Sequence, residues 1–144
     1  MSLCIYFIHC DEPHQPIKIG YAADPATRLY SMQVGCPLPL SLMAYAEVPD
    51  AKQVEARLHE RFDESRIRGE WFAATPELLE VAKAAESYQD ALVRSAISGV
   101  APRVPACLSG DQLADYRAKR RERLLLKLRA RLDARDAARK LESP

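Results

Sequence analysis

Two short apolar segments near the start of the chain, residues 3–9 and 17–22, most constrain how the sequence can fold. Both are rich in isoleucine and aromatic residues, which favours β-strands. The residues between them include two prolines, which cannot donate hydrogen bonds to a neighbouring strand, so we expect a loop there. The second segment runs into Asp24-Pro25, a helix cap followed by a proline suited to the first helical turn. The sequence therefore predicts a β-hairpin that leads directly into a helix.

The rest of the chain adds one strand and three further helices. In the second helix Val54, Leu58 and Phe62 recur every four residues, and such an apolar stripe must face a core. Glu55 and His59 stack four residues apart on an adjoining face. The expected order after the hairpin is a helix to about residue 35, a strand at 40–48, a helix at about 51–63, a turn and short extended segment at 66–72, a helix at 76–97, a linker at 98–110 rich in glycine and proline, and a final helix at 111–141.

These elements predict an α/β fold of the α+β type, with a small three-stranded antiparallel sheet flanked by helices. We expect one domain over residues 1–97, the linker at 98–110 and a basic helical tail over 111–144. A chain of 144 residues is long enough to bury a core but short for two domains.

Composition narrows the class of protein. The chain is 48% hydrophobic and 28% charged, as soluble globular proteins are. It has no apolar run of the roughly 20 residues that a membrane span needs, and no secretory signal is visible. Its four cysteines form no CxxC pair, which favours reduced thiols. We therefore expect a cytoplasmic protein that does not engage a membrane.

Charge is distributed unevenly along the chain. Residues 1–110 carry 10 Lys and Arg against 14 Asp and Glu, whereas residues 111–144 carry 11 against 6. Basic charge gathered at one end points to an anionic partner, for which nucleic acid is the usual candidate. A solvated charged helix explains the charge alone equally well.

An ordered series of short motifs runs through residues 3–75, about half of the chain. It consists of Cys4-Ile5-Tyr6-Phe7-Ile8, Ile17-Lys18-Ile19-Gly20, Asp24-Pro25 with Arg28-Leu29, Gln33, Pro37, Leu40, Leu42, Glu55 with Leu58-His59, Phe62, Arg66 and Gly69-Glu70-Trp71-Phe72. In this order and spacing the series resembles the GIY-YIG endonuclease superfamily. Within it the likeness is to the branch typified by a phage T5 open reading frame and the meiotically up-regulated gene 113 domain. An ordered series is far more specific than one triplet, since short motifs recur by chance.

The resemblance implies a three-stranded antiparallel sheet with packed helices, and a metal-dependent endonuclease that cleaves phosphodiester bonds in DNA with one divalent ion, Mg²⁺ or Mn²⁺. Such hydrolysis needs a nucleophilic water, a proton acceptor, positive charge near the phosphate and a metal at the leaving oxygen. The substrate would be DNA, including branched or partly single-stranded forms.

On this resemblance Tyr6 activates or orients the water. An ordinary tyrosine pKa lies near 10, so Tyr6 would need nearby cations, which Lys18 and Arg28 could supply. Lys18 stands where the second motif usually has tyrosine, a departure common in this branch. Tyr21 follows Gly20, but its side chain points the opposite way.

Arg28 matches the helix arginine of the family, whose planar fork suits phosphate. Some members have a histidine four residues later, where this chain has Met32. His59 would shuttle a proton or bind phosphate. Glu70 is the expected metal ligand, with Trp71 and Phe72 behind it to anchor the segment. The residues expected to contact nucleic acid are Lys18, Arg28, Arg66, Arg117, Lys119, Arg120, Arg121 and Arg123.

Other interpretations of the same residues stay open. Arg28 could pair with Asp24 and His59 with Glu55 for stability alone. Arg66 could likewise form an ion pair with Glu64 or Glu70 and make no contact with phosphate. The chain could be a non-catalytic nucleic-acid-binding module that keeps the fold, or an interaction domain whose final helix pairs with a partner or forms a homodimer. A zinc site is a further alternative, with Cys4, His9, Cys10 and His14 as ligands.

Overall fold

The computed structural model describes residues 2–11, 15–109 and 113–141. The helices and strands predicted from the sequence are present, with bounds that differ by at most two residues. In chain order the elements are β1 (Cys4–Cys10), β2 (Ile17–Ala22), α1 (Pro25–Val34), β3 (Leu40–Glu47), α2 (Ala51–Arg61), the 3₁₀ turn η1 (Asp63–Ser65), β4 (Arg66–Arg68), β5 (Trp71–Phe72), α3 (Pro76–Ser98), the 3₁₀ turn η2 (Ala106–Leu108) and α4 (Leu113–Leu141).

The strands form one antiparallel sheet of five in the order β3-β1-β2-β5-β4. The predicted three-stranded sheet is therefore wrong in strand number, although the α+β class is confirmed. The two additional strands come from residues 66–72, where the sequence predicts only a turn and a short extended segment. They have three and two residues, too few for an alternating apolar pattern. Pairing with β2, through Ile17 with Phe72 and Lys18 with Trp71, makes them strands.

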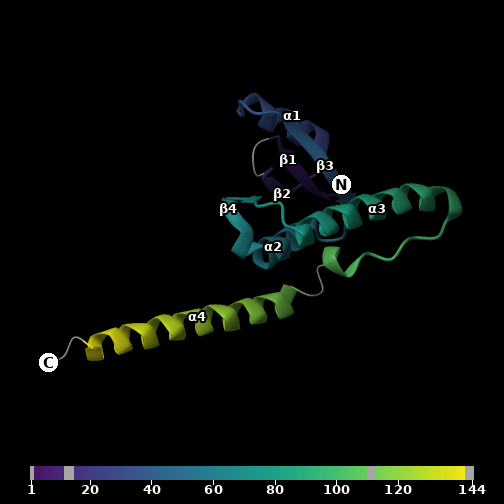
Figure 1. The fold of residues 1–144 in the computed structure, drawn as a ribbon. Helices are drawn as coiled ribbons and strands as arrows, with labels where there is room; N and C mark the ends of the chain where they lie inside the picture. Colours follow the sequence, from purple (N-terminus) through teal and green to yellow (C-terminus); the bar gives the residue numbers. More distant parts are fainter. Residues whose placement is uncertain (1, 12–14, 110–112, 142–144) are drawn as a thin grey trace.

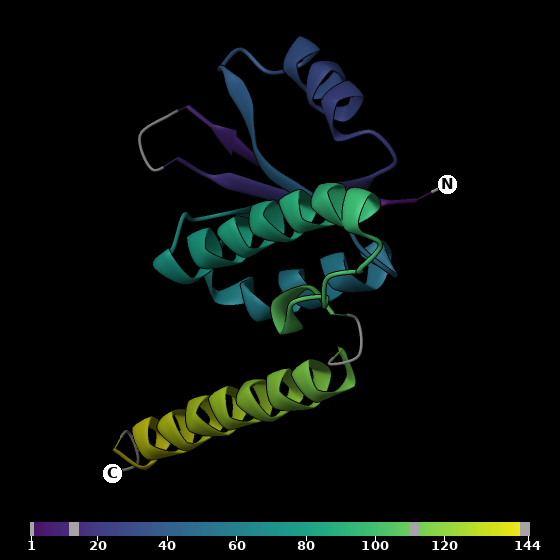
Figure 2. The same cartoon turned by 90° about the vertical axis from the view of Figure 1, so that its right-hand side faces the viewer.

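The sheet separates two layers of helices. Figures 1 and 2 show α2 and α3 together on one side of the sheet and α1 on the other. The hydrophobic core lies between the sheet and the α2–α3 layer, where Ile5 and Phe7 of β1 pack with Val54 and Leu58 of α2. Residues alternate between the faces of a strand, so Tyr6 lies on the opposite face, toward α1. Packing in the core thus fixes the position of β1, and the opposite face of this strand carries the polar Tyr6 side chain.

The segment after α3 folds back onto the domain. Gly99, with φ of 73°, ends α3 in the left-handed conformation that glycine adopts readily. Leu108 in η2 is fully buried in the core, and the guanidinium of Arg57 in α2 donates a hydrogen bond to the Ala106 carbonyl at 3.1 Å. Part of the segment predicted as a linker, residues 98–110, therefore packs against α2.

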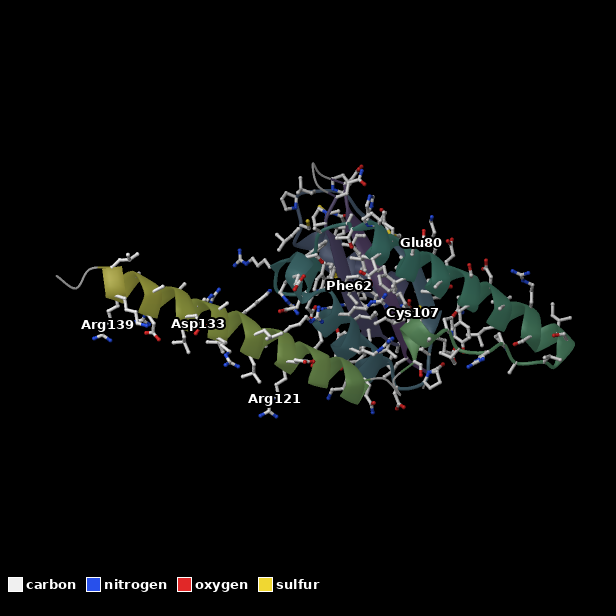
Figure 3. The ribbon with its side chains drawn as sticks, turned by 60° about the horizontal axis from the view of Figure 1, so that its bottom comes forward. Phe62, Glu80, Cys107, Arg121, Asp133 and Arg139 are labelled. Carbon is white, nitrogen blue, oxygen red and sulfur yellow. The ribbon has the colours of Figure 1, made fainter. Side chains whose placement is uncertain are left out.

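The last helix, α4, lies along α2 and then extends beyond the domain. Lys127 of α4 pairs with Glu64 of η1, with an Nζ to Oε1 distance of 3.4 Å. Figure 3 shows Arg139 far from Phe62 and Cys107, which lie within the body of the molecule. Five leucines between positions 124 and 132 are 48–61% exposed. Among the helices described, α4 included, none has the length and apolar character that crossing a membrane requires.

Candidate active site

Tyr6 lies at the centre of the sheet, opposite Gly20 of β2 on one side and Tyr45 of β3 on the other. Its side chain is almost completely buried, with 2% of its surface exposed. A Cβ atom at position 20 would lie 2.9 Å from Cε2 of the Tyr6 ring, and nearer still to Cζ and the hydroxyl oxygen. Because Gly20 has no side chain, the Tyr6 ring can lie directly across β2.

The α1 helix brings Arg28 to the Tyr6 hydroxyl. Asp24 caps the helix, since its carboxylate accepts from the amides of Ala26 at 3.0 Å and Thr27 at 3.2 Å. The Arg28 guanidinium donates a hydrogen bond to Tyr6, and this contact raises the pKa of Arg28. Within the described ranges no ion pair joins Asp24 to Arg28, so Asp24 serves as the helix cap and Arg28 faces the sheet.

Lys18 lies on the same face of β2 as Gly20, two residues earlier. It is buried, with 8% of its surface exposed, and its ammonium group forms an ion pair with the Glu70 carboxylate. Glu70 reaches this position because the β4–β5 hairpin pairs with β2, where the Ile19 amide donates to the Glu70 carbonyl at 3.1 Å. Strand pairing between segments fifty residues apart therefore brings these two charges together.

Glu70 is held in its ionised form. Burial on its own would raise the pKa of this carboxyl, but the hydrogen bond and charge of Lys18, with the charge of Arg28 and that of His59 at acidic pH where it is protonated, keep it below the ordinary value. Its side chain remains 45% exposed. An anionic, accessible carboxylate thus stands beside a lysine and within the field of an arginine.

His59 reaches the site from α2. Its Nε2 donates to the Ile19 carbonyl at 2.9 Å, because a carbonyl can only accept. The ring packs against Phe72 with 5.2 Å between centroids. Burial lowers the pKa of His59, and the positive charges of Arg66 and Lys18 lower it further. The imidazole is therefore neutral at pH 7, and one of its nitrogens is already engaged.

Glu55, one helical turn before His59, lies within the electrostatic influence of Lys18 and Glu70. It is half-buried, and its pKa is raised by burial and by the negative charge of Glu70, an effect that Lys18 and Lys52 partly offset. Reasoning from the sequence did not place Glu55 among the site residues. The signal that could have found it was its four-residue spacing from His59, which put both side chains on one face of α2.

The structure thus gathers Tyr6, Lys18, Arg28, His59 and Glu70 in one place. Arg66 lies next to them on β4, with its guanidinium directed at hydrogen-bond acceptors of the protein itself. Tyr21 pairs with Ile5 and so lies on the other face of the sheet from Tyr6.

Of the basic residues expected in the tail, the two whose side chains the structure describes, Arg121 and Arg123, do not join this cluster. Arg123 lines a small cavity of about 40 Å³ with Glu60, Asp63 and Glu64, and Arg121 is exposed on α4. The side chains of Arg117, Lys119 and Arg120 lie outside the described part of the structure.

The carboxylates near Lys18 are ligands of the kind that bind a hard cation such as Mg²⁺ weakly. Mg²⁺ usually takes one or two carboxylates and completes its shell with water and substrate phosphate, and Glu70 offers one such ligand. Among the residues whose placement is described, no group of three or more His, Cys, Asp or Glu could hold a metal ion. The zinc alternative gains no support from this, and one of its ligands, His14, falls outside the described residues.

An antiparallel sheet on which Tyr6, Lys18 and Glu70 meet an arginine from the helix after the hairpin is the arrangement expected of a GIY-YIG-like domain. The model of one family, the T5orf172 domain, matches residues 3–87, more than half of the chain. The chain therefore belongs to the T5orf172 domain family, which lies in the GIY-YIG-like endonuclease branch. This domain is characteristic of nuclease-like or DNA-binding modules, so nucleic acid is the class of partner that membership indicates. No match to the chain was found among the curated proteins or the solved structures.

Proposed function

We propose that this protein is a divalent-metal-dependent endonuclease that hydrolyses phosphodiester bonds in DNA. The observation that carries the proposal is the meeting of Tyr6, Lys18, Arg28 and Glu70, which come from separate segments of a T5orf172 domain. Each supplies one of the parts that hydrolysis of a phosphodiester needs.

Tyr6 orients or deprotonates the attacking water. Its hydroxyl accepts a hydrogen bond from Arg28, so the phenol oxygen is held beside the guanidinium that would contact the phosphate. The closeness of Gly20 holds the ring in one orientation toward that water.

Lys18 and Arg28 stabilise the negative charge that develops on the phosphate. Arg28 is exposed and its planar guanidinium can contact two phosphate oxygens, whereas Lys18 provides a buried point charge. Lys18 also keeps Glu70 ionised through their ion pair. His59 is neutral, and it supports the site through its hydrogen bond to the Ile19 carbonyl and its packing on Phe72. Because Nε2 is engaged, His59 can exchange a proton only through Nδ1.

Glu70 would hold the Mg²⁺ or Mn²⁺ ion. When bound, the ion supplies positive charge that stabilises the leaving oxygen. The carboxylate suits this task because it is ionised, partly exposed and fixed by the pairing of the hairpin with β2.

The basic helix α4 adds affinity that does not depend on base sequence. Its exposed arginines, Arg121 and Arg123 among them, would neutralise phosphates and release counterions. Binding should therefore weaken steeply as salt is added.

The ion pair between Lys18 and Glu70 favours a second candidate, a non-catalytic nucleic-acid-binding module. A lysine that neutralises the proposed ligand competes with a cation for the same carboxylate. On this alternative the site binds DNA phosphate but does not cleave it.

The decisive experiment incubates supercoiled plasmid with the full chain in Mg²⁺, Mn²⁺ or EDTA. Glu70→Ala and Tyr6→Phe should abolish nicking, while Glu80→Ala and Tyr30→Phe, at exposed positions on α3 and α1, should not. DNA affinity is measured in parallel by fluorescence anisotropy. DNA binding without metal-dependent cleavage by the wild type would establish the non-catalytic alternative, and cleavage that both site variants retain would overturn the assigned roles.

A further inference from the structure

The guanidinium of Arg66 makes three hydrogen bonds within the protein. Its Nε donates to the Asp63 carboxylate at 3.0 Å, one terminal nitrogen donates to the His59 carbonyl at 3.2 Å, and the other donates to the Gly69 carbonyl. The same group lies over the Phe72 ring, with 4.8 Å from Cζ to the ring centroid. All three nitrogens of the fork are thus engaged by acceptors of the chain itself.

These acceptors belong to the segments that carry the site. Gly69 immediately precedes Glu70 and adopts φ of 56°, the left-handed conformation that its tight turn requires. His59 lies in the last turn of α2, and its ring shares Phe72 with Arg66. Arg66 therefore connects the turn before Glu70 to the helix that carries His59 and to η1 between them.

Arg68, two residues further along the same strand, is the natural comparison. It is exposed, and within the described ranges no hydrogen bond or ion pair involves its guanidinium. Of the two arginines of β4, Arg68 is available to an external anion, whereas each nitrogen of Arg66 already donates one hydrogen bond within the protein, which uses three of its five N–H donors.

We infer that Arg66 is a positioning residue that holds the Gly69–Glu70 turn against α2, and that it is not a phosphate contact. The inference deepens the proposed function, on which it rests, because the group being positioned is the proposed metal ligand. It also replaces the phosphate contact that the sequence predicts for Arg66 with a different role.

The chemistry of arginine accounts for this role. A guanidinium presents donors in fixed directions within one plane and so can join three acceptors at once, whereas an ammonium group is a point charge without that geometry. Without Arg66 the carbonyls of Gly69 and His59 lose a charged donor, and the turn that sets the position of Glu70 is released. Groups that orient a metal ligand from behind typically change metal affinity by roughly 10–100-fold.

The test compares Arg66→Ala, Arg66→Lys and Arg68→Ala in the full chain. Mn²⁺ affinity is measured without DNA by electron paramagnetic resonance, with Glu70→Ala marking the site. Both Arg66 variants should weaken Mn²⁺ binding by roughly tenfold or more, yet in EDTA their DNA affinity should keep the wild-type salt dependence. Arg68→Ala should keep the Mn²⁺ affinity and lower the slope of log K against log salt by about 0.9.

A second measurement needs no metal. The Ile19 amide donates to the Glu70 carbonyl, so its hydrogen exchange should accelerate in Arg66→Ala and not in Arg68→Ala. Wild-type Mn²⁺ affinity and wild-type Ile19 exchange in Arg66→Ala would overturn the inference, as would a salt slope reduced like that of Arg68→Ala. If the wild type itself shows no Glu70-dependent Mn²⁺ binding, the metal part of the proposed function is overturned, while faster Ile19 exchange would still support the positioning role.

Discussion

Tyr6 and Gly20 face each other across β1 and β2, and the Tyr6 ring fills the space that any side chain at position 20 would need. The glycine of this motif is therefore required by the tyrosine opposite it. Its own backbone conformation does not demand glycine, since its φ is not in the left-handed region.

Replacing Gly20 by alanine should disturb the site more than the fold. The added methyl group must displace the buried Tyr6 ring, whose hydroxyl meets Arg28, and overpacking of this kind costs about 1–3 kcal/mol. We expect Gly20→Ala to remain folded, with a lower free energy of unfolding in urea, and to lose most of its plasmid nicking. Gly35→Ala is the matched control, because its Cβ would have only the Met32 carbonyl within 4 Å, at 3.9 Å. Equal activity and stability of the two variants would show that the Tyr6 ring is not confined.

His59 should titrate below its ordinary pKa of about 6.5 when followed by NMR. Burial lowers the pKa of His59 in the folded state, so the unfolded state binds more protons between the folded pKa and 6.5. The free energy of unfolding should therefore fall as the pH drops through that window. In His59→Gln this contribution to the pH dependence should disappear. A His59 titration midpoint at or above 6.5 would contradict the buried, Ile19-bonded imidazole.

Glu55→Gln should stabilise the protein at neutral pH. The pKa of Glu55 is raised in the folded state, so the folded protein binds more protons than the unfolded protein above the ordinary carboxyl pKa, and stability is lost as the pH rises through the folded value. The amide cannot ionise, so the melting temperature of Glu55→Gln should exceed that of the wild type at pH 8 and match it near pH 4. Glu80→Gln, an exposed substitution on α3, should change stability by no more than about 0.5 kcal/mol. A lower melting temperature of Glu55→Gln at pH 8 would mean that the ionised carboxylate is needed for stability.

The outer half of α4 should contribute to DNA affinity through charge alone. Arg129, Arg131 and Arg135 are exposed there, and replacing all three with glutamine should reduce the salt slope of DNA binding by about 0.9 for each phosphate that is no longer neutralised. Lys127→Gln is the control, since Lys127 pairs with Glu64 at the surface of the domain. This substitution should change stability by at most about 1 kcal/mol. Unchanged DNA affinity in the triple variant would instead favour a protein partner for this helix.

Local sequence signals predict most of the fold. Asp24-Pro25 and Thr75-Pro76 mark the starts of α1 and α3, and in both cases the side chain of the first residue caps the helix. The hairpin of β1 and β2 carries its own alternating pattern and two prolines between the strands. These signals act over a few residues, so the sequence reveals them directly.

The structural features that the sequence does not predict depend on contacts between distant segments. β4 and β5 are strands only because Trp71 and Phe72 pair with β2, more than fifty residues earlier. The closeness of Glu55 to Lys18 and Glu70 depends on how α2 crosses the sheet, which no local pattern specifies. The hydrogen bonds of Arg66 to the carbonyls of His59 and Gly69 likewise depend on the position of α2 and on the Gly69 turn, which no local pattern specifies.

The ion pair of Lys127 with Glu64 also determines how much of α4 extends beyond the domain. From that contact to Leu141 the helix continues for fourteen residues, which at 1.5 Å per residue is about 21 Å. Duplex DNA rises about 3.4 Å per base pair, so a rod of this length spans roughly six base pairs. If the arginines of α4 lie along one DNA strand, the helix would contact about this length of the duplex. The protein's footprint on DNA should then extend asymmetrically, on the side of the site toward which α4 projects.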